Sequence, residues 1–290
     1  MKLVILLTIL GLSMEPGASA QRLPRTTVPE SYDLSFEPDL EKATFTGNEV
    51  IHVVQRVPSN TITLNSAQIE FQEATVTSGD LAQRAEIATS ERNETATLTL
   101  AKPVPDGPAE IHIRFTGVPS NNLNGFYLSK TPRRKYAVTQ FEPTDARRAF
   151  PSFDEPSYKA VFRIRLVIGD GDAAISNGRI VSDTPGPEKN KHTIEFAPTP
   201  RISTYLVAMI VGDFSCREEN VDGIPIRVCA VPEQYALTDY ALRCARDNLS
   251  FYDKYFSQKY PYGKLDIIAV PDFEAGGWKM WQRSLSTSHC

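Results

Sequence analysis

The side chains that could do chemistry gather in residues 139–156, which read TQFEPTDARRAFPSFDEP. This stretch holds Gln140, Glu142, two arginines, several carboxylates and three prolines. No single helix or strand period covers it, and proline interrupts helices. Polar groups on irregular backbone at the end of a strand often bind ligands. The alternative is a structural turn in which arginines and carboxylates satisfy one another.

The elements around this stretch are predicted to be mostly β-strands. Residues 135–140 (KYAVTQ) form a short strand that leads into the polar turn. From residue 32 to 231, short apolar or alternating runs are separated by Gly, Asn, Asp and Pro turn signals. The continuous apolar run 205–211 (YLVAMIV) is predicted to be one of these strands. The expected fold is mainly β, a large antiparallel β-sandwich.

The pattern changes after Pro232. Residues 233–258 contain no Gly or Pro, and their apolar side chains recur at steps of three and four, which predicts an amphipathic helix. The apolar stripe of this helix is expected to contain Leu237, Ala241, Cys244 or Ala245, Leu249, Tyr252 and Phe256. A buried strand at residues 265–270 (LDIIAV) follows.

Residues 139–156 resemble the TQFEPTxARxAFPCFDEP signature of the aminopeptidase N-like zinc metallopeptidases, with Ser152 where many relatives have Cys. Residues 123–128 (LNGFYL) and 260–273 (YPYGKLDIIAVPDF) extend the resemblance, which runs from about residue 23 to 277. In this family a saddle-like β domain precedes an α/β thermolysin-like catalytic domain. The resemblance therefore implies the start of such a catalytic domain after the sandwich.

The expected division of the chain has four parts. Residues 1–20 read as a signal peptide, because a ten-residue apolar run precedes an A-x-A cleavage site at residues 18–20. Residues 21–231 are the N-terminal β domain, and residues 232–277 are the start of the catalytic domain. Residues 278–290 are interpreted as an out-of-frame tail. The signal peptide predicts export to the periplasm or the extracellular space.

The zinc chemistry of this family needs an HExxH helix, in which two His bind the metal and the Glu activates a water molecule. The four histidines are His52, His112, His192 and His289, and none belongs to such a motif. Zinc is therefore expected in a complete family enzyme, but no metal ligand and no catalytic residue is assigned in this chain. The sequence is interpreted as stopping before HExxH, which predicts that the chain alone is inactive.

The resemblance implies a role in binding the α-amine of peptide N-termini. By motif position, Gln140 and Glu142 are the substrate-binding pair from the β domain, and Gly276 and Gly277 begin the G-x-M-E-N element. Lys279 then stands where the family has Glu, and a cation there would repel an ammonium group. Codons for residues 278–286 (WKMWQRSLS) can be chosen that encode MENVAEITF in the neighbouring frame, which suggests a frameshift. The alternative is a genuine variant loop.

Composition limits the classes of partner that the chain could bind. The formal net charge of −4 gives no basic footprint for nucleic acid, and no apolar run after the signal is long enough to span a membrane. Cys216 and Cys229 flank a predicted turn at residues 222–223, so a disulfide between them is possible in an exported protein; free thiols are the alternative. The competing function is a non-enzymatic β-sandwich that binds peptides or a partner. A glycan-binding sandwich has only the fold to support it.

Overall fold

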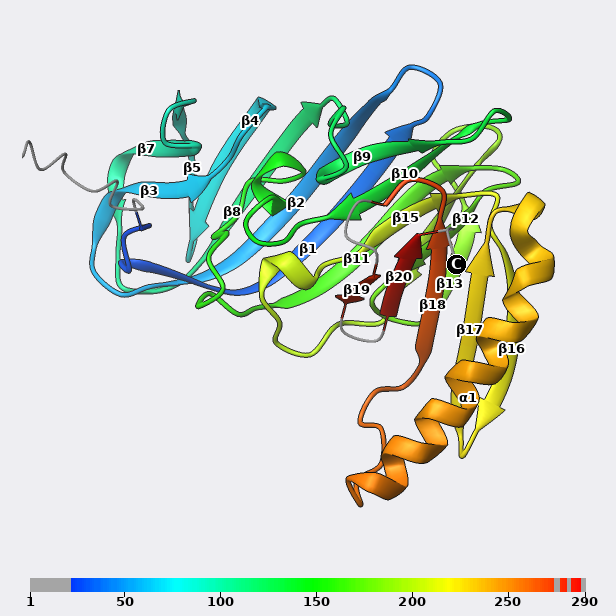
Figure 1. The fold of residues 1–290 in the computed structure, drawn as a ribbon. Helices are drawn as coiled ribbons and strands as arrows, with labels where there is room; N and C mark the ends of the chain where they lie inside the picture. The colour runs from blue at the N-terminus through cyan, green and yellow to red at the C-terminus, as the bar shows by residue number, and fades with distance from the viewer. Residues whose placement is uncertain (1–21, 274–276, 281–282, 288–290) are drawn as a thin grey trace, which may run out of the picture.

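The computed structural model describes residues 22–273, 277–280 and 283–287 (Figure 1). The described residues are mainly β, as predicted, and form four sheets and one long helix. The largest sheet has eight strands, and all its pairs are antiparallel except β1 with β11. Their order across this sheet is β13 (Ile180–Pro185), β14 (Lys191–Phe196), β11 (Val161–Gly169), β1 (Thr27–Asp39), β2 (Thr44–Gln55), β8 (Gly107–Gly117), β4 (Ile69–Ser78) and β5 (Leu81–Arg84).

Two smaller antiparallel sheets accompany it. One has the order β3 (Ser59–Asn65), β7 (Thr95–Val104) and β6 (Glu86–Ser90). The other has the order β12 (Ala173–Ser176), β15 (Met209–Gly212), β10 (Lys135–Gln140) and β9 (Gly125–Lys130). The strand predicted at residues 135–140 is therefore present with the predicted bounds.

The fourth sheet contains both parallel and antiparallel pairs. Its order is β16 (Ser215–Val221), β17 (Ile224–Ala230), β18 (Leu265–Val270), β20 (Arg283–Thr287) and β19 (Gly277–Met280). The helix α1 (Thr238–Tyr255) connects β17 to its parallel neighbour β18, which is the usual way to join parallel strands. Since β16 and β17 share this sheet with β18, the sheet begins at Ser215, before the predicted division at residue 232.

The core between the sheets is rich in aromatic side chains. Strand β2 alternates buried residues with exposed or half-buried ones along its length, so one face packs inward and the other faces outward. Buried rings that contact one another include Tyr32, Phe36, Phe45, Phe115, Phe126, Phe150 and Phe162.

Two of these rings lie over glycines on the neighbouring strand. Phe115 of β8 pairs with Gly47 of β2, and Phe45 of β2 pairs with Gly117 of β8. A Cβ atom built on either glycine would come within 2.2 Å of the opposing ring. Each glycine therefore leaves the space that the ring across the strand pair occupies.

The prediction of one strand over residues 205–211 was wrong. The segment starts with the 3₁₀ turn η2 (Thr204–Leu206), and its strand, β15, begins only at Met209. The reason is that side chains bind this backbone: Asn177 binds the carbonyl oxygen of Leu206 and the amide of Ala208, and Ser176 binds the carbonyl oxygen of Ala208. Side-chain partners replace a neighbouring strand, so the ladder starts later.

The helix predicted over residues 233–258 begins with a separate 3₁₀ segment, η3 (Pro232–Leu237), before α1. Its buried stripe contains Leu242, Ala245 and Leu249, whereas Leu237, Tyr252 and Phe256 are exposed, in contrast to the predicted stripe. The helix packs against β16 and β17, and its C-terminal end lies at the tip of the molecule in Figure 1. The predicted periodicity therefore continues past the part of the helix that the sheet covers.

Candidate ligand-binding turn after strand β10

The predicted site residue Gln140 is the last residue of β10, and the structure holds this strand from both sides. All six residues of β10 pair with β9, and Ala137 pairs with Val211 of β15. Residues 136–139 are buried, and the hydroxyl of Thr139 accepts a hydrogen bond from the amide of Met209 at 2.9 Å. The end of β10 is therefore a fixed point on which side chains can be presented.

A hydrogen bond from backbone to side chain links Glu142 to Gln140. The amide of Glu142 donates to Oε1 of Gln140 at 2.7 Å, while Phe141 between them is buried. The peptide bond between Glu142 and Pro143 is cis. The Glu142 side chain is exposed, and no described residue forms a hydrogen bond or an ion pair with its carboxylate. This carboxylate is therefore available to a positively charged ligand.

The arginines that follow in the turn bind carboxylates of the protein itself. Arg147 Nε lies 3.0 Å from Asp154 Oδ2, and another guanidinium nitrogen donates to the carbonyl oxygen of Asp154 at 3.0 Å. Arg147 and Arg148 both contact Glu94, and Arg148 also contacts Asp145 at 2.9 Å. These contacts show that Arg147, Arg148 and Asp154 hold the turn together.

Asp154 is the buried centre of this network. Burial raises the pKa of its carboxyl group, while the Thr204 hydroxyl and Arg147 act in the opposite direction. Its amide donates to Asn65 Oδ1 at 3.0 Å, and Asn65 also exchanges two backbone hydrogen bonds with Ser152. The FDEP segment is thereby attached to the end of β3.

Three of these supporting residues, Asn65, Glu94 and Thr204, are absent from the predicted site. Each lies in a different part of the sequence, outside residues 139–156, and no local pattern marks it. Glu155, the next residue after Asp154, accepts a hydrogen bond from the amide of Leu23 at 2.6 Å.

Asp272 precedes Gly276 and Gly277, the predicted second half of the amine-binding site, and it is hydrogen-bonded to β9. The Tyr127 hydroxyl donates to the carbonyl oxygen of Asp272 at 2.9 Å, the Lys130 amide donates to Asp272 Oδ2 at 3.0 Å, and the Asp272 amide donates to Ser129 Oγ at 3.1 Å. Gly276 lies outside the described residues. Gly277 begins strand β19, where it pairs with Ser286 of β20. Residues 278–280 and 283–287 of the predicted tail thus lie in strands.

The histidines do not lie at this turn. His52 and His112 are on β2 and β8, where they contact Asp33 and Glu110, and His192 on β14 contacts Asp183. His289 is outside the described residues. Among the residues that the structure describes, no group of three or more His, Cys, Asp or Glu could hold a metal ion. The described part of the chain therefore does not fit a zinc site.

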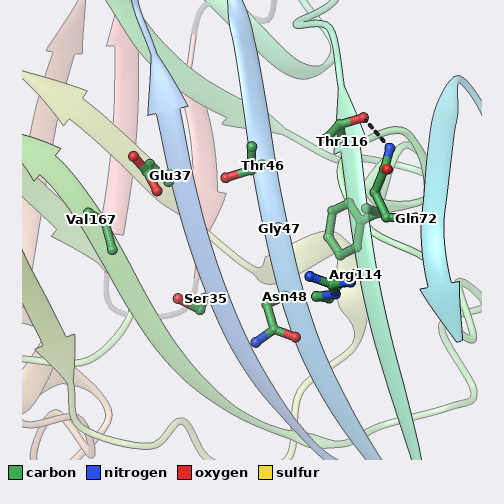
Figure 2. Close-up of a pocket in the computed structure, with 10 residues that line it drawn as sticks. Ser35, Glu37, Thr46, Gly47, Asn48, Gln72, Arg114, Thr116 and Val167 are labelled. Atoms are coloured by element: carbon green, nitrogen blue, oxygen red, sulfur yellow. Dashed lines mark hydrogen bonds between the residues drawn. The ribbon is translucent and has the colours of Figure 1, made fainter. Parts of the chain in front are cut away.

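A separate concavity lies on the eight-stranded sheet, and Figure 2 shows its polar lining. Thr46 and Asn48 from β2 and Arg114 and Thr116 from β8 contribute to it, together with Glu37 from β1. Gln72 donates to Thr116 at 3.3 Å, and Arg114 pairs with Glu73 at 2.8 Å. Neither Gln140 nor Glu142 lines this concavity, so it is distinct from the turn after β10.

The cysteine pair lies in the fourth sheet. The structure joins Cys216 of β16 and Cys229 of β17 by a disulfide, at a position where the two residues are cross-strand partners. Cys244 on α1 is a free thiol.

Comparison with known proteins identifies the class of protein. The family model of the peptidase M1 N-terminal domain matches residues 28–206. The chain is 34% identical to aminopeptidase N from Acetobacter pasteurianus over 91% of this chain and 75% of that protein. It is 38% identical to aminopeptidase 2 from Candida albicans over 92% of this chain and 30% of that protein.

This chain therefore belongs to the peptidase M1 family, and it is an aminopeptidase N-like member. It spans about 30% of the length of several matched relatives, including the mitochondrial aminopeptidase 2 of Saccharomyces cerevisiae, which is 37% identical and covered to 28%. Within the described residues, no helix is both long and apolar enough to cross a membrane.

Proposed function

We propose that this chain is the N-terminal part of an exported zinc aminopeptidase, and that it contributes half of the site that binds the α-amino group of a peptide. The observation that carries this proposal is the contact between Gln140 and Glu142 at the end of β10. A carboxylate held near a second polar group can bind an ammonium ion and fix which peptide bond is presented for hydrolysis.

The supporting network explains how the pair would be positioned. The buried strand β10 fixes Gln140, and the Gln140 side chain binds the backbone of Glu142. The network of Arg147, Asp154 and Glu94 holds the far side of the turn. In a longer family member, a second domain that covers the Glu142 carboxylate would exclude water and strengthen its attraction to an ammonium group.

Zinc would supply a polarised carbonyl group and an activated water molecule in the complete enzyme. Because the described residues provide no zinc site, we expect this chain alone to lack hydrolytic activity. The test is the hydrolysis of aminoacyl-arylamides by the purified chain with added Zn²⁺. Turnover above a heat-denatured control would contradict the proposed inactivity.

Amine recognition is tested separately from hydrolysis. Chemical-shift titrations with a peptide that has a free amine and with its N-acetylated form should show weak binding of the free amine only. Glu142→Gln should abolish this preference, whereas Glu86→Gln on β6, an exposed residue outside the turn, should leave it unchanged. Equal binding of both peptides, unaffected by Glu142→Gln, would instead favour the alternative of a general peptide-binding module.

The proposed export and the proposed frame of the tail have their own tests. Expression with residues 1–20 attached should yield a secreted chain that starts at Gln21 by N-terminal sequencing.

The nucleotide sequence beyond codon 277 should contain a downstream HExxH that a one-base change brings into frame. A locus without such a motif would mean that residues 278–290 are a genuine variant of the family loop.

A further inference from the structure

Strand β18 is tied to the four-stranded sheet near its start. The side chain of Lys264 is buried, and its ammonium group donates to the carbonyl oxygen of Ser176 on β12 at 3.1 Å. The same ammonium group contacts Asp266 at 2.9 Å, and Arg227 of β17 donates two hydrogen bonds, of 2.8 and 2.7 Å, to Asp266. Because breaking a buried ion pair by removing one member is costly, the start of β18 has a fixed position.

The chain beyond the end of β18 is tied to the same sheet through Asp272. Three groups of β9 hold this residue: the Tyr127 hydroxyl, the Ser129 hydroxyl and the Lys130 amide. Tyr127 and Ser129 are fully buried. Burial and the charge of Asp272 raise the pKa of Tyr127, so its hydroxyl stays protonated and donates. The bonds use the amide, the carbonyl oxygen and the carboxylate of Asp272, and together they fix its orientation as well as its place.

The next residue, Phe273, is anchored by packing. It is buried in an apolar cluster that both sheets share, with Tyr127 and Val138 from the β9–β10 hairpin and Ile268 and Val270 from β18. Side chains in such close-packed cores have few alternative arrangements. The direction in which the chain leaves β18 is therefore set by polar and apolar contacts with the hairpin.

The site residue Gln140 lies at the other end of this hairpin. Gln140 pairs with Gly125 of β9, whereas the hydroxyl that holds the Asp272 amide belongs to Ser129. The four residue steps from Ser129 to Gly125 measure about 14 Å in an antiparallel strand. Asp272 and Gly277 are five residues apart, and five residues span at most about 17 Å. A chain that leaves Asp272 along β9 is thus long enough to bring Gly277 to the end of β10.

We propose that Asp272 is a positioning residue: through β9 it directs the chain that leads to Gly277 toward Gln140 and Glu142, so that one hairpin aligns both halves of the amine-binding site. This inference rests on the proposed function, since it assumes that the two halves bind one amine. It makes the β domain responsible for the distance between them. Such distances matter because a small misplacement of a substrate-positioning group lowers catalysis strongly.

Energy transfer from tryptophan to a dye on the turn tests this arrangement. Trp278 immediately follows the second half of the site and is the only tryptophan of the chain once Trp281 is replaced by Phe. The acceptor is a naphthalene dye on Glu142→Cys, in a background that also carries Cys244→Ser and Cys290→Ser. Time-resolved emission of the labelled chain should show efficient transfer and a narrow distribution of distances.

Variants of the hairpin contacts test the role of Asp272. The triple variant Tyr127→Phe, Ser129→Ala and Asp272→Ala should lose most of the transfer, and Asp272→Ala alone should lose part of it. Asp272→Asn keeps an acceptor oxygen for the amide of β9 and should retain the transfer. Ser176→Ala removes a buried hydrogen bond of 2.7 Å from the same sheet, without touching Asp272, and should also retain it. Circular dichroism confirms that each variant is folded.

Two results would overturn the proposal. Weak transfer in the unaltered hairpin would show that the chain after Asp272 does not return to the end of β10. Transfer that survives in the triple variant, or that Ser176→Ala lowers equally, would show that Asp272 does not position this chain. The proposed function is judged separately, by amine binding to the unlabelled chain with Glu142 intact. A lost amine preference with efficient transfer would count against the function alone, and the reverse would count against Asp272 alone.

Discussion

Arg147 and Asp154 form a buried ion pair that joins the two ends of the turn after β10. The guanidinium group of Arg147 makes three contacts at once: with the Asp154 side chain, with the Asp154 carbonyl oxygen and with Glu94. A planar guanidinium group can satisfy all three acceptors in a fixed geometry, whereas a lysine ammonium group cannot. Arg147 thus connects the start of the turn to the FDEP segment and to Glu94.

Arg147→Ala should lower the free energy of unfolding by about 3 to 5 kcal/mol, because it leaves the buried Asp154 carboxylate without its cation. Arg147→Lys should cost less, since the charge remains. Urea denaturation measures both changes. Arg163→Ala, which breaks the exposed pair with Asp33, is the matched control and should cost about 1 kcal/mol or less. A loss for Arg147→Ala as small as that of the control would mean that water replaces the lost contacts.

Glu49 on β2 should make the folded state less stable as the pH rises. Its carboxyl group is buried, neither oxygen has a hydrogen-bond partner among the described residues, and burial raises its pKa well above the usual value of 4.5. The folded state therefore prefers the protonated form. Its contribution to stability is fully present below pH 4.5 and is lost as the pH rises through the folded-state pKa.

Glu49→Gln removes this titration and tests its sign. The difference in the free energy of unfolding between Glu49→Gln and the parent should move in favour of the variant by up to about 1.4 kcal/mol per pH unit above pH 4.5. Urea denaturation of both proteins over a series of pH values measures this, because the other groups titrate alike in both. A difference that stays constant with pH would show that Glu49 is solvated in the folded state.

Ser152→Cys should be neutral or stabilising by about 1 kcal/mol, because a buried unpaired hydroxyl costs about that much or more. Ser152 is fully buried, and its hydroxyl has no hydrogen-bond partner among the described residues. Cys has nearly the same shape and is among the most buried residue types. Thermal unfolding of the variant tests this, with Ser157→Cys at an exposed position as the control for a new thiol. A clear loss of stability would mean that the hydroxyl binds a water molecule.

Removal of the disulfide by the double variant Cys216→Ser and Cys229→Ser should destabilise the fourth sheet by about 3 kcal/mol, the value expected for a closed loop of roughly this length. The two residues are 13 positions apart, one on each strand of the β16–β17 hairpin. Hydrogen exchange in β16, β17 and α1 should rise more than exchange in the eight-stranded sheet. Cys244→Ser should leave both regions unchanged, and equal changes in all regions would show that the sheets unfold together.

The sequence predicts local features well and long-range partners poorly. Strand β10 follows from a short strand-like run, KYAVTQ, that ends in a polar turn, and its bounds agree with the structure. The pairing of Arg147 with Glu94 spans 53 positions, and no local pattern marks Glu94 as a partner. The apolar run before β15 looks like a strand, but the side chains of Ser176 and Asn177 bind its backbone first. Tyr252 and Phe256 fit the apolar stripe of a helix, but they are exposed because the sheet does not extend far enough to cover them.

The reciprocal pairing of Phe45 with Gly117 and of Gly47 with Phe115 also restricts how β2 and β8 can align. A shift of two positions would keep every side chain on its own face and would thus preserve the division between apolar and polar faces. It would also place at least one of the two rings against a residue that has a side chain, where a Cβ atom would occupy the same space as the ring. The two Phe–Gly pairs therefore permit only the observed register between β2 and β8. A register shift between these two central strands during folding would be disfavoured.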